Sequence, residues 1–154
     1  MSERLADYLS LIPIFSALQP EEVLTIEKYM FFNKIEPGEF VFREGEKGDY
    51  VCFVASGALD VIKLNQHAKP VVMTTLAKGN SMGEMALIDK LTRSASVRAC
   101  TPTNLIVLTR KGFDLILKQH PDIGIKILKG VALLLSINLR KTSDKLAEFM
   151  PPLT

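Results

Sequence analysis

The sequence GEMALIDKLTRSA, residues 83–95, is the stretch that decides the fold of this chain. It places a carboxylate, Glu84, and a guanidinium, Arg93, nine residues apart, with a short helix-forming run between them. An arginine can donate two parallel hydrogen bonds to a phosphate, and the free backbone N–H groups at the start of a short helix add further donors. A carboxylate repels that phosphate but accepts hydrogen bonds from hydroxyls of the same ligand. Phosphate together with hydroxyl indicates a nucleotide.

The fuller run GEMALIDKLTRSASVRA, residues 83–99, resembles the phosphate-binding cassette of the cyclic-nucleotide-binding domain family, the type found in the catabolite activator and in the regulatory subunit of protein kinase A. A second motif, VFREGEKGDYVCFVASG at residues 41–57, resembles the family's strand, paired-glycine turn, hydrophobic strand and closing glycine. Phe42 and Cys52 depart from the usual aliphatic residues there, and Met82 stands where the family often has an aromatic residue. The resemblance covers about Leu11 to Phe149.

The resemblance implies roles for the cassette side chains. Glu84 would accept a hydrogen bond from the ribose 2′-hydroxyl, and Arg93 would pair with the cyclic phosphate. Ser94 would add a hydroxyl and a backbone N–H to the same oxygens, and the remaining residues would line the ligand mainly through backbone and shape. The candidate ligand-binding residues are Gly83, Glu84, Met85, Ala86, Arg93, Ser94, Ala95 and Thr142.

The pattern along the chain predicts a single domain over residues 1–154. Residues 3–31 have a helical pattern, with Pro20 starting a helix, and the N-terminal helical segment is placed at 1–36. From Pro37 to about Leu108 the period changes to that of strands, which predicts a β-roll over 37–109 with the cassette at 83–95. Helices follow at 110–149. Gly45 and Gly48 are interpreted as turn glycines with positive φ.

Short apolar runs separated by Gly, Asn, Lys or Pro predict the strands, at residues 40–42, 51–54, 58–64, 71–76, 95–99 and 105–108. Several are apolar on both faces, as expected when both sides of a roll are covered. The predicted fold class is therefore mainly β with flanking α. It is an antiparallel β-roll or jelly roll with N-terminal helices, a short cassette helix and a long C-terminal helix.

Pro121 and Asp122 open that long helix, which is predicted to run to about Phe149 before two prolines stop it. Its apolar residues alternate by four and three positions, as in a coiled-coil seam of three heptads. A helix that is apolar on two faces favours an intermolecular helix pair, and hence a homodimer. Burial lengthwise on its own domain is the alternative. The seam residues are Leu128, Ala132, Leu135, Leu139, Thr142, Leu146 and Phe149, while Ile127, Val131 and Leu134 lie off the seam and are expected to pack on the roll.

In the family, this helix is the dimer helix of bacterial transcription regulators, which continue into a helix-turn-helix domain. The chain ends about five residues after the predicted helix. We therefore expect a stand-alone bacterial-type member that does not bind DNA directly. The basic residues Arg140, Lys141 and Lys145 are interpreted as a solvated helix face.

Thr142 has two interpretations. A polar residue in a leucine seam can set the register of a helix pair. Alternatively, Thr142 and Ser143 resemble the threonine-led pair that dimeric family members place over the purine, one residue reaching from each subunit. The second interpretation favours adenine, although a hydroxyl such as that of Ser94 can also serve guanine.

Composition and motifs exclude several classes. The net charge of +2 and the pI of about 8.5 are too mild to indicate nucleic acid or an anionic membrane. Residues 1–13 do not resemble a signal peptide, and Val131–Leu139 is too short to span a bilayer, so a cytoplasmic location is expected. His67 and His120 have no metal-site or triad partners in the pattern, and no Walker-type or dinucleotide glycine motif is present. The chain is not expected to be an enzyme or to hold a metal.

The resulting prediction is a sensor that binds cAMP, with cGMP as the second choice, and shifts between conformational populations. The cassette would move inward, Leu87 would press against Phe113, and the C-terminal helix would close over the base through Thr142. Two alternatives stay open. One is a dimeric interaction module with an empty pocket or a larger ligand such as a cyclic dinucleotide. The other is a transcription-regulator sensor that acts through a separate DNA-binding partner. The sequence does not identify the output protein.

Overall fold

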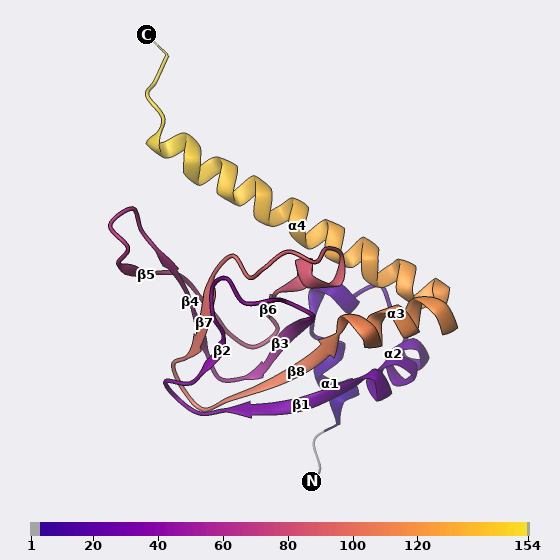
Figure 1. The fold of residues 1–154 in the computed structure, drawn as a ribbon. Helices are drawn as coiled ribbons and strands as arrows, with labels where there is room; N and C mark the ends of the chain where they lie inside the picture. The colour runs from indigo at the N-terminus through magenta and orange to yellow at the C-terminus, as the bar shows by residue number, and fades with distance from the viewer. Residues whose placement is uncertain (1–3, 154) are drawn as a thin grey trace.

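The computed structural model describes residues 4–153. Its helical elements are α1 (Leu5–Leu9), η1 (Pro13–Phe15), α2 (Pro20–Ile26), η2 (Glu27–Tyr29), η3 (Glu84–Leu87), α3 (Arg110–Gln119) and α4 (Pro121–Phe149). Its strands are β1 (Met30–Ile35), β2 (Phe40–Phe42), β3 (Tyr50–Ser56), β4 (Leu59–Leu64), β5 (Pro70–Leu76), β6 (Ser81–Met82), β7 (Ser96–Ala99) and β8 (Thr103–Thr109). Figure 1 shows the N-terminal helices and α3 gathered at one end of the sheets, with α4 running from that end toward the side where the β4–β5 hairpin projects.

The strands form two antiparallel four-stranded sheets, in the orders β1-β8-β3-β6 and β2-β7-β4-β5. The central pair of the first sheet, β3 and β8, sets Phe53 opposite Ile106, and both side chains are fully buried. The predicted fold class, an antiparallel β-roll flanked by helices, is confirmed. The cassette helix η3 is a single 3₁₀ turn.

The N-terminal segment differs from the prediction. Residues 1–36 were expected to be helical, but β1 occupies Met30–Ile35 and pairs along its whole length with β8. Its four central residues, including Phe31 and Phe32, are exposed, so the strand lacks the alternation that marks a half-buried strand. Pairing with β8 overrides the local pattern. The short strand β6 was also missed, and the part of the predicted helical segment that falls on residues 1–3 lies outside the described residues.

The β5 strand is less covered than predicted. Several of the predicted strands were expected to be covered on both faces, but in the run at 71–76 Val71, Val72 and Met73 are 39–56% exposed. The reason is topological, because β5 is the edge strand of its sheet and pairs only with β4. The expectation of a roll covered on both sides is therefore wrong for β5.

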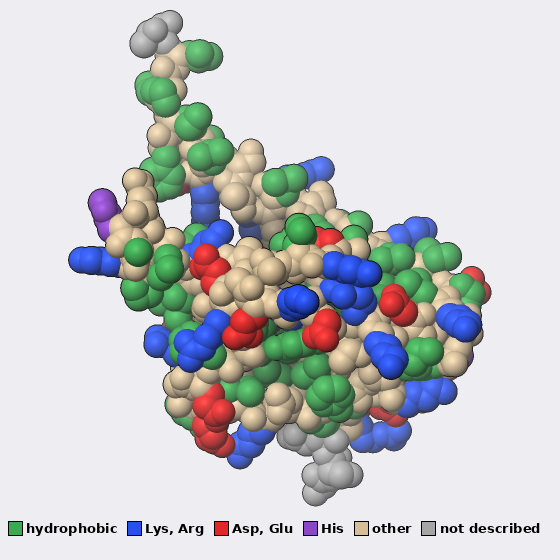
Figure 2. Space-filling view, in the orientation of Figure 1, with side chains coloured by type: hydrophobic (Ala, Val, Ile, Leu, Met, Phe, Trp, Pro, Cys, Tyr) green, Lys and Arg blue, Asp and Glu red, His purple; other side chains and the backbone are tan. Residues whose placement is uncertain are grey.

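The long helix α4 begins and ends where the sequence predicted, at Pro121 and Phe149. Its first half is anchored: Ile127 and Val131 are fully buried, and a Cβ at Gly130 would collide with the carbonyl of Ile14 in η1. Its second half is uncovered, with every residue from 136 to 149 exposed. Burial of the whole helix on its own domain is therefore wrong for this half. Figure 2 shows apolar side chains, in green, along the distal part of α4 and on the neighbouring hairpin.

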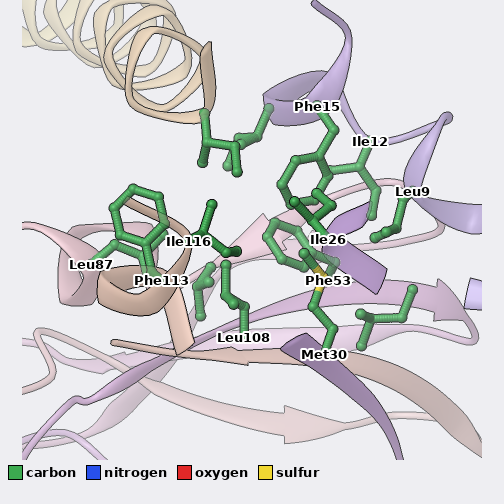
Figure 3. Packing of buried hydrophobic residues seen from close by; sticks show 14 of the residues in the cluster. Leu9, Ile12, Phe15, Ile26, Met30, Phe53, Leu87, Leu108, Phe113 and Ile116 are labelled. Carbon is green, nitrogen blue, oxygen red and sulfur yellow. The ribbon is translucent and has the colours of Figure 1, made fainter. Parts of the chain in front are cut away.

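The core consists of two buried clusters. The first joins the N-terminal helices, the β3–β8 pair, α3 and the first half of α4. The second lies between the two sheets and includes Phe42, Leu59 and Leu105. Leu87 of η3 belongs to the first cluster together with Phe113 of α3, and Figure 3 shows these two side chains close together. The cassette is thus packed directly against the C-terminal helices.

Candidate functional site

A cavity of about 370 Å³ lies between the second sheet, the cassette and α4. Seven of the eight predicted ligand-binding residues line it, namely Gly83, Glu84, Met85, Ala86, Arg93, Ser94 and Ala95. The eighth, Thr142, does not line it. The α4 residue that does is Asn138, one turn earlier, whose carbonyl accepts a hydrogen bond from the Thr142 hydroxyl at 2.9 Å. Figure 2 shows an opening between the projecting hairpin and the distal part of α4.

The cassette begins with a backbone turn that only glycine accommodates readily. Gly83 has φ +75°, in the left-handed region. A Cβ at this position would also overlap Nη1 of Arg93 and lie 3.3 Å from the Tyr50 carbonyl oxygen. The turn is closed by a hydrogen bond from the Ala86 N–H to the Gly83 carbonyl at 2.9 Å. Gly83 therefore brings the η3 backbone against the arginine.

Arg93 is buried and only partly satisfied. Its side chain donates from Nη2 to the Tyr50 carbonyl oxygen at 2.7 Å, and the residue is 7% exposed. Its Nε, also buried, has no hydrogen-bond partner, and within residues 4–153 no carboxylate lies within 4.0 Å of the guanidinium. A buried donor of this kind is costly unless a ligand satisfies it. Arg93 fits a phosphate oxygen.

Glu84 is the second buried group with an unsatisfied atom. Its Oε2 has no hydrogen-bond partner among the described residues. Burial raises the pKa of the carboxyl, while a backbone hydrogen bond within Glu84, the charge of Arg93 and the Ser81 hydroxyl act in the opposite direction. An oxygen in this setting accepts readily from a ligand hydroxyl. The cavity therefore offers an acceptor for hydroxyl and a donor for phosphate in one enclosure.

Two glycines, Gly45 and Gly48, allow the loop at residues 44–50 to turn and to approach Arg93 closely. Gly45 has φ +89°, so its prediction as a turn glycine is confirmed. Gly48 does not have positive φ, and the same prediction is wrong for it. A Cβ at Gly48 would lie 2.8 Å from Nε of Arg93, so the position needs glycine for space. The sequence pattern could not reveal this requirement, because Arg93 is 45 residues away.

Arg110, which the sequence analysis did not single out, binds backbone carbonyl groups of the cassette. Its Nε donates to the Ala86 carbonyl at 2.7 Å, and its Nη2 donates to the carbonyls of Gly48 at 2.6 Å and Asp89 at 2.8 Å. Its three acceptors are backbone carbonyl groups, which every residue type has, so the sequence pattern could not reveal this role of Arg110. One arginine thereby ties the cassette and the 44–50 loop to the first turn of α3.

The two histidines lie away from the cavity. His67 is exposed in the β4–β5 turn, and His120 joins α3 to α4 with its ring beside Tyr29. In the part of the chain that the structure describes, no cluster of three or more His, Cys, Asp or Glu side chains is arranged to hold a metal ion. In the same part, no helix has the length and apolar character needed to cross a membrane.

The model of the family described as "Cyclic nucleotide-binding domain" matches residues 32–120, more than half of the chain, and includes the whole cassette. The chain belongs to this family.

Relatives and solved structures agree with the match. The chain is 38% identical to a cGMP-dependent protein kinase of Plasmodium berghei over 106 residues, which are 69% of this chain and 12% of the kinase. A cyclic nucleotide-binding domain from Methylobacillus flagellatus has a TM-score of 0.86 at 26% identity, covering 96% of this chain and 87% of that one. The catabolite activator protein of Thermus thermophilus has a TM-score of 0.80 at 28% identity, covering 89% and 62%.

The chain is a small part of its curated relatives. It spans 8% to 28% of the lengths of those compared, which include kinases, lysophospholipases and a putative potassium channel. In such proteins the shared segment is one domain among others.

Proposed function

We propose that this chain is a sensor of a cyclic mononucleotide, cAMP before cGMP, with no catalysis of its own. One observation carries the proposal: Oε2 of Glu84 and Nε of Arg93 are buried and lack hydrogen-bond partners, and the two residues line the same cavity. A ligand with a ribose hydroxyl and a cyclic phosphate satisfies both atoms at once. Leaving such groups unpaired costs about 1–3 kcal/mol each, so a ligand that pairs them gains this free energy on binding.

The charge of the cavity favours one phosphate over two. Arg93 is the only Lys or Arg among the lining residues, which also include the carboxylates of Glu84 and Asp89. A cyclic dinucleotide would bring a second phosphodiester charge into a low-dielectric space without a cation to meet it. We therefore favour a mononucleotide over the larger ligand.

The base is assigned to the part of the cavity between the second sheet and α4. Val61, Leu76 and Val97 provide apolar walls there, and Thr74 and Asn138 provide polar groups. The preference for adenine rests on Thr142 and Ser143. Because the Thr142 hydroxyl donates to Asn138 within its own helix, it must exchange this partner to reach a base.

The signal is proposed to leave the cassette through α3. Leu87 and Phe113 share a buried cluster, and Arg110 adds three hydrogen bonds across the same junction. The first half of α4 is held to the N-terminal elements, where Lys126 pairs with Glu22 at 2.7 Å. The distal half of α4 is exposed and can change its position relative to the sheets. Ligand binding would shift the populations of these helix positions.

Assembly through the distal half of α4 is part of the proposal. Leu139 is 70% exposed, Leu146 is 57% exposed and Phe149 is 83% exposed, all on the predicted seam. A second copy of the same helix would cover this apolar stripe. Control of transcription would need a separate DNA-binding partner.

Isothermal titration calorimetry of cAMP and cGMP into purified protein, shown first to carry no nucleotide, tests the function. Saturable binding at micromolar or lower concentration, one ligand per chain, supports the sensor. Absence of heat with both ligands, from folded and empty protein at two temperatures, rejects it and favours the interaction module.

A further inference from the structure

Two aromatic rings contact the guanidinium of Arg93. Its Cζ lies 4.0 Å from the centre of the Phe42 ring and 4.6 Å from that of Tyr50. The rings come from different strands, β2 and β3, and their centres are 6.3 Å apart at an interplanar angle of 70°. They form a wedge around the cation.

The wedge explains how a buried cation exists in this cavity without a carboxylate in direct contact. An ionised group taken out of water normally needs a paired charge, yet none of the ion pairs within residues 4–153 includes Arg93. The negative faces of aromatic rings stabilise a cation, and more strongly when water is excluded. Ring faces contact the guanidinium without consuming its N–H donors. A carboxylate partner would have consumed the donors that a phosphate requires.

The N–H groups of the Arg93 guanidinium differ in their hydrogen bonding. Nη2 is committed to the Tyr50 carbonyl, while the buried Nε has no partner. Glycines at 48 and 83 let the loop and cassette close on both sides of the group. We propose that Phe42 and Tyr50 are positioning residues, which hold the Arg93 guanidinium oriented with Nε unpaired and available to the phosphate of the ligand. The proposal rests on the proposed function, since it specifies how the phosphate receptor is prepared before ligand arrives.

Phe42 makes the proposal specific to this chain. Phe42→Leu replaces the ring by an aliphatic side chain and keeps the position apolar. If the ring orients Arg93, this substitution should weaken cAMP binding by about tenfold, which lies between the worth of an exposed and of a desolvated cation–π contact. Tyr50→Leu should have a similar effect. Tyr50→Phe keeps the ring and should recover most of the affinity lost in Tyr50→Leu.

The matched control is Phe53→Leu. Phe53 is also fully buried and contacts another ring, Phe15, but it belongs to the first core cluster and does not line the cavity. The control should lower the thermal unfolding temperature while leaving the Kd for cAMP unchanged. Equal loss of affinity in Phe53→Leu and Phe42→Leu would show a general effect of destabilisation and overturn the proposal.

A second measurement requires no ligand. In the NMR spectrum of the ligand-free protein, the Arg93 Nε–H signal should be shifted by the two rings and should move toward its ordinary position in Phe42→Leu. A loss of affinity without this movement would mean that Phe42 contacts the ligand directly, and would overturn the positioning role. An unshifted Nε–H in the wild type would also overturn it. Failure of the wild type to bind cyclic nucleotides, with the shift present, would instead reject the proposed function.

Discussion

Nε of Arg110 donates a hydrogen bond to the carbonyl oxygen of Ala86 at 2.7 Å, which joins the first residue of α3 to the middle of the cassette. The same guanidinium donates to the carbonyls of Gly48 and Asp89. The cassette turn is therefore connected to the C-terminal helices by a fixed polar contact as well as by the apolar contact of Leu87. Any inward movement of the cassette must act on α3.

Arg110→Ala should loosen the cassette. It leaves three carbonyl groups without their charged donor, so we expect the free energy of unfolding to fall by about 3 kcal/mol. The Kd for cAMP should rise as well, because the cassette must be ordered before it binds. Chemical denaturation and calorimetry measure the two effects. The neighbouring exposed Lys111→Ala is the control, and matching behaviour of the two variants would show that Arg110 has no special role.

Arg93→Ala should weaken cAMP binding by about 2–5 kcal/mol, which is about thirtyfold to several-thousandfold. The ligand-free variant should not lose stability in proportion, because removing a buried cation that has no ion-pair partner also removes a desolvation cost. Titration and thermal unfolding of the same samples test both statements. Unchanged affinity would remove Arg93 from the site.

Cyclic nucleotide binding should release protons at mildly acidic pH. Burial raises the pKa of Glu84 above its ordinary 4.5 in the free protein. The stability that protonated Glu84 contributes is therefore fully present below 4.5 and is lost as the pH rises through the raised pKa. A ligand hydroxyl that donates to the carboxylate favours the charged form, so affinity should increase with pH across this window by up to about tenfold per unit.

Calorimetry in buffers of different ionisation enthalpy measures this proton release directly. Glu84→Gln keeps an acceptor oxygen but cannot titrate, so the release should vanish while weak binding persists. Proton release that is equal in the wild type and in Glu84→Gln would assign the pH dependence to another group.

Leu139→Lys combined with Leu146→Lys should dissociate a dimer formed through α4. Both side chains are more than half exposed in the single chain, so the fold should be unaffected while the apolar stripe is lost. Sedimentation velocity over a range of concentrations reports the association state. Leu133→Lys is the control, since Leu133 is 61% exposed on the same helix but lies off the seam. A wild type that stays monomeric with and without ligand would contradict the assembly.

Much of the architecture could be predicted from local patterns. The cassette is a continuous run, so the seven predicted binding residues within 83–95 all line the cavity. The bounds of α4 follow from Pro121 at its start and the prolines after Phe149, because proline is favoured in the first turn of a helix and cannot continue one. The strand periods were sufficient to predict a β-roll. In each case the residues that determine the structure are neighbours in the chain.

The remaining features depend on groups that are distant in the chain. β1 is a strand because its backbone pairs with β8, although its exposed phenylalanines carry no strand alternation. Arg110 binds carbonyl oxygens, which every residue type possesses, so no residue pattern marks it. The contacts of Phe42 and Gly48 with Arg93, and the entry of Asn138 into the cavity in place of Thr142, exist only once the sheets close. Residue types and spacing thus determined which groups are candidates for the proposed cyclic-nucleotide site, whereas folding decided which donors stay free, because burial and long-range backbone contacts set their partners.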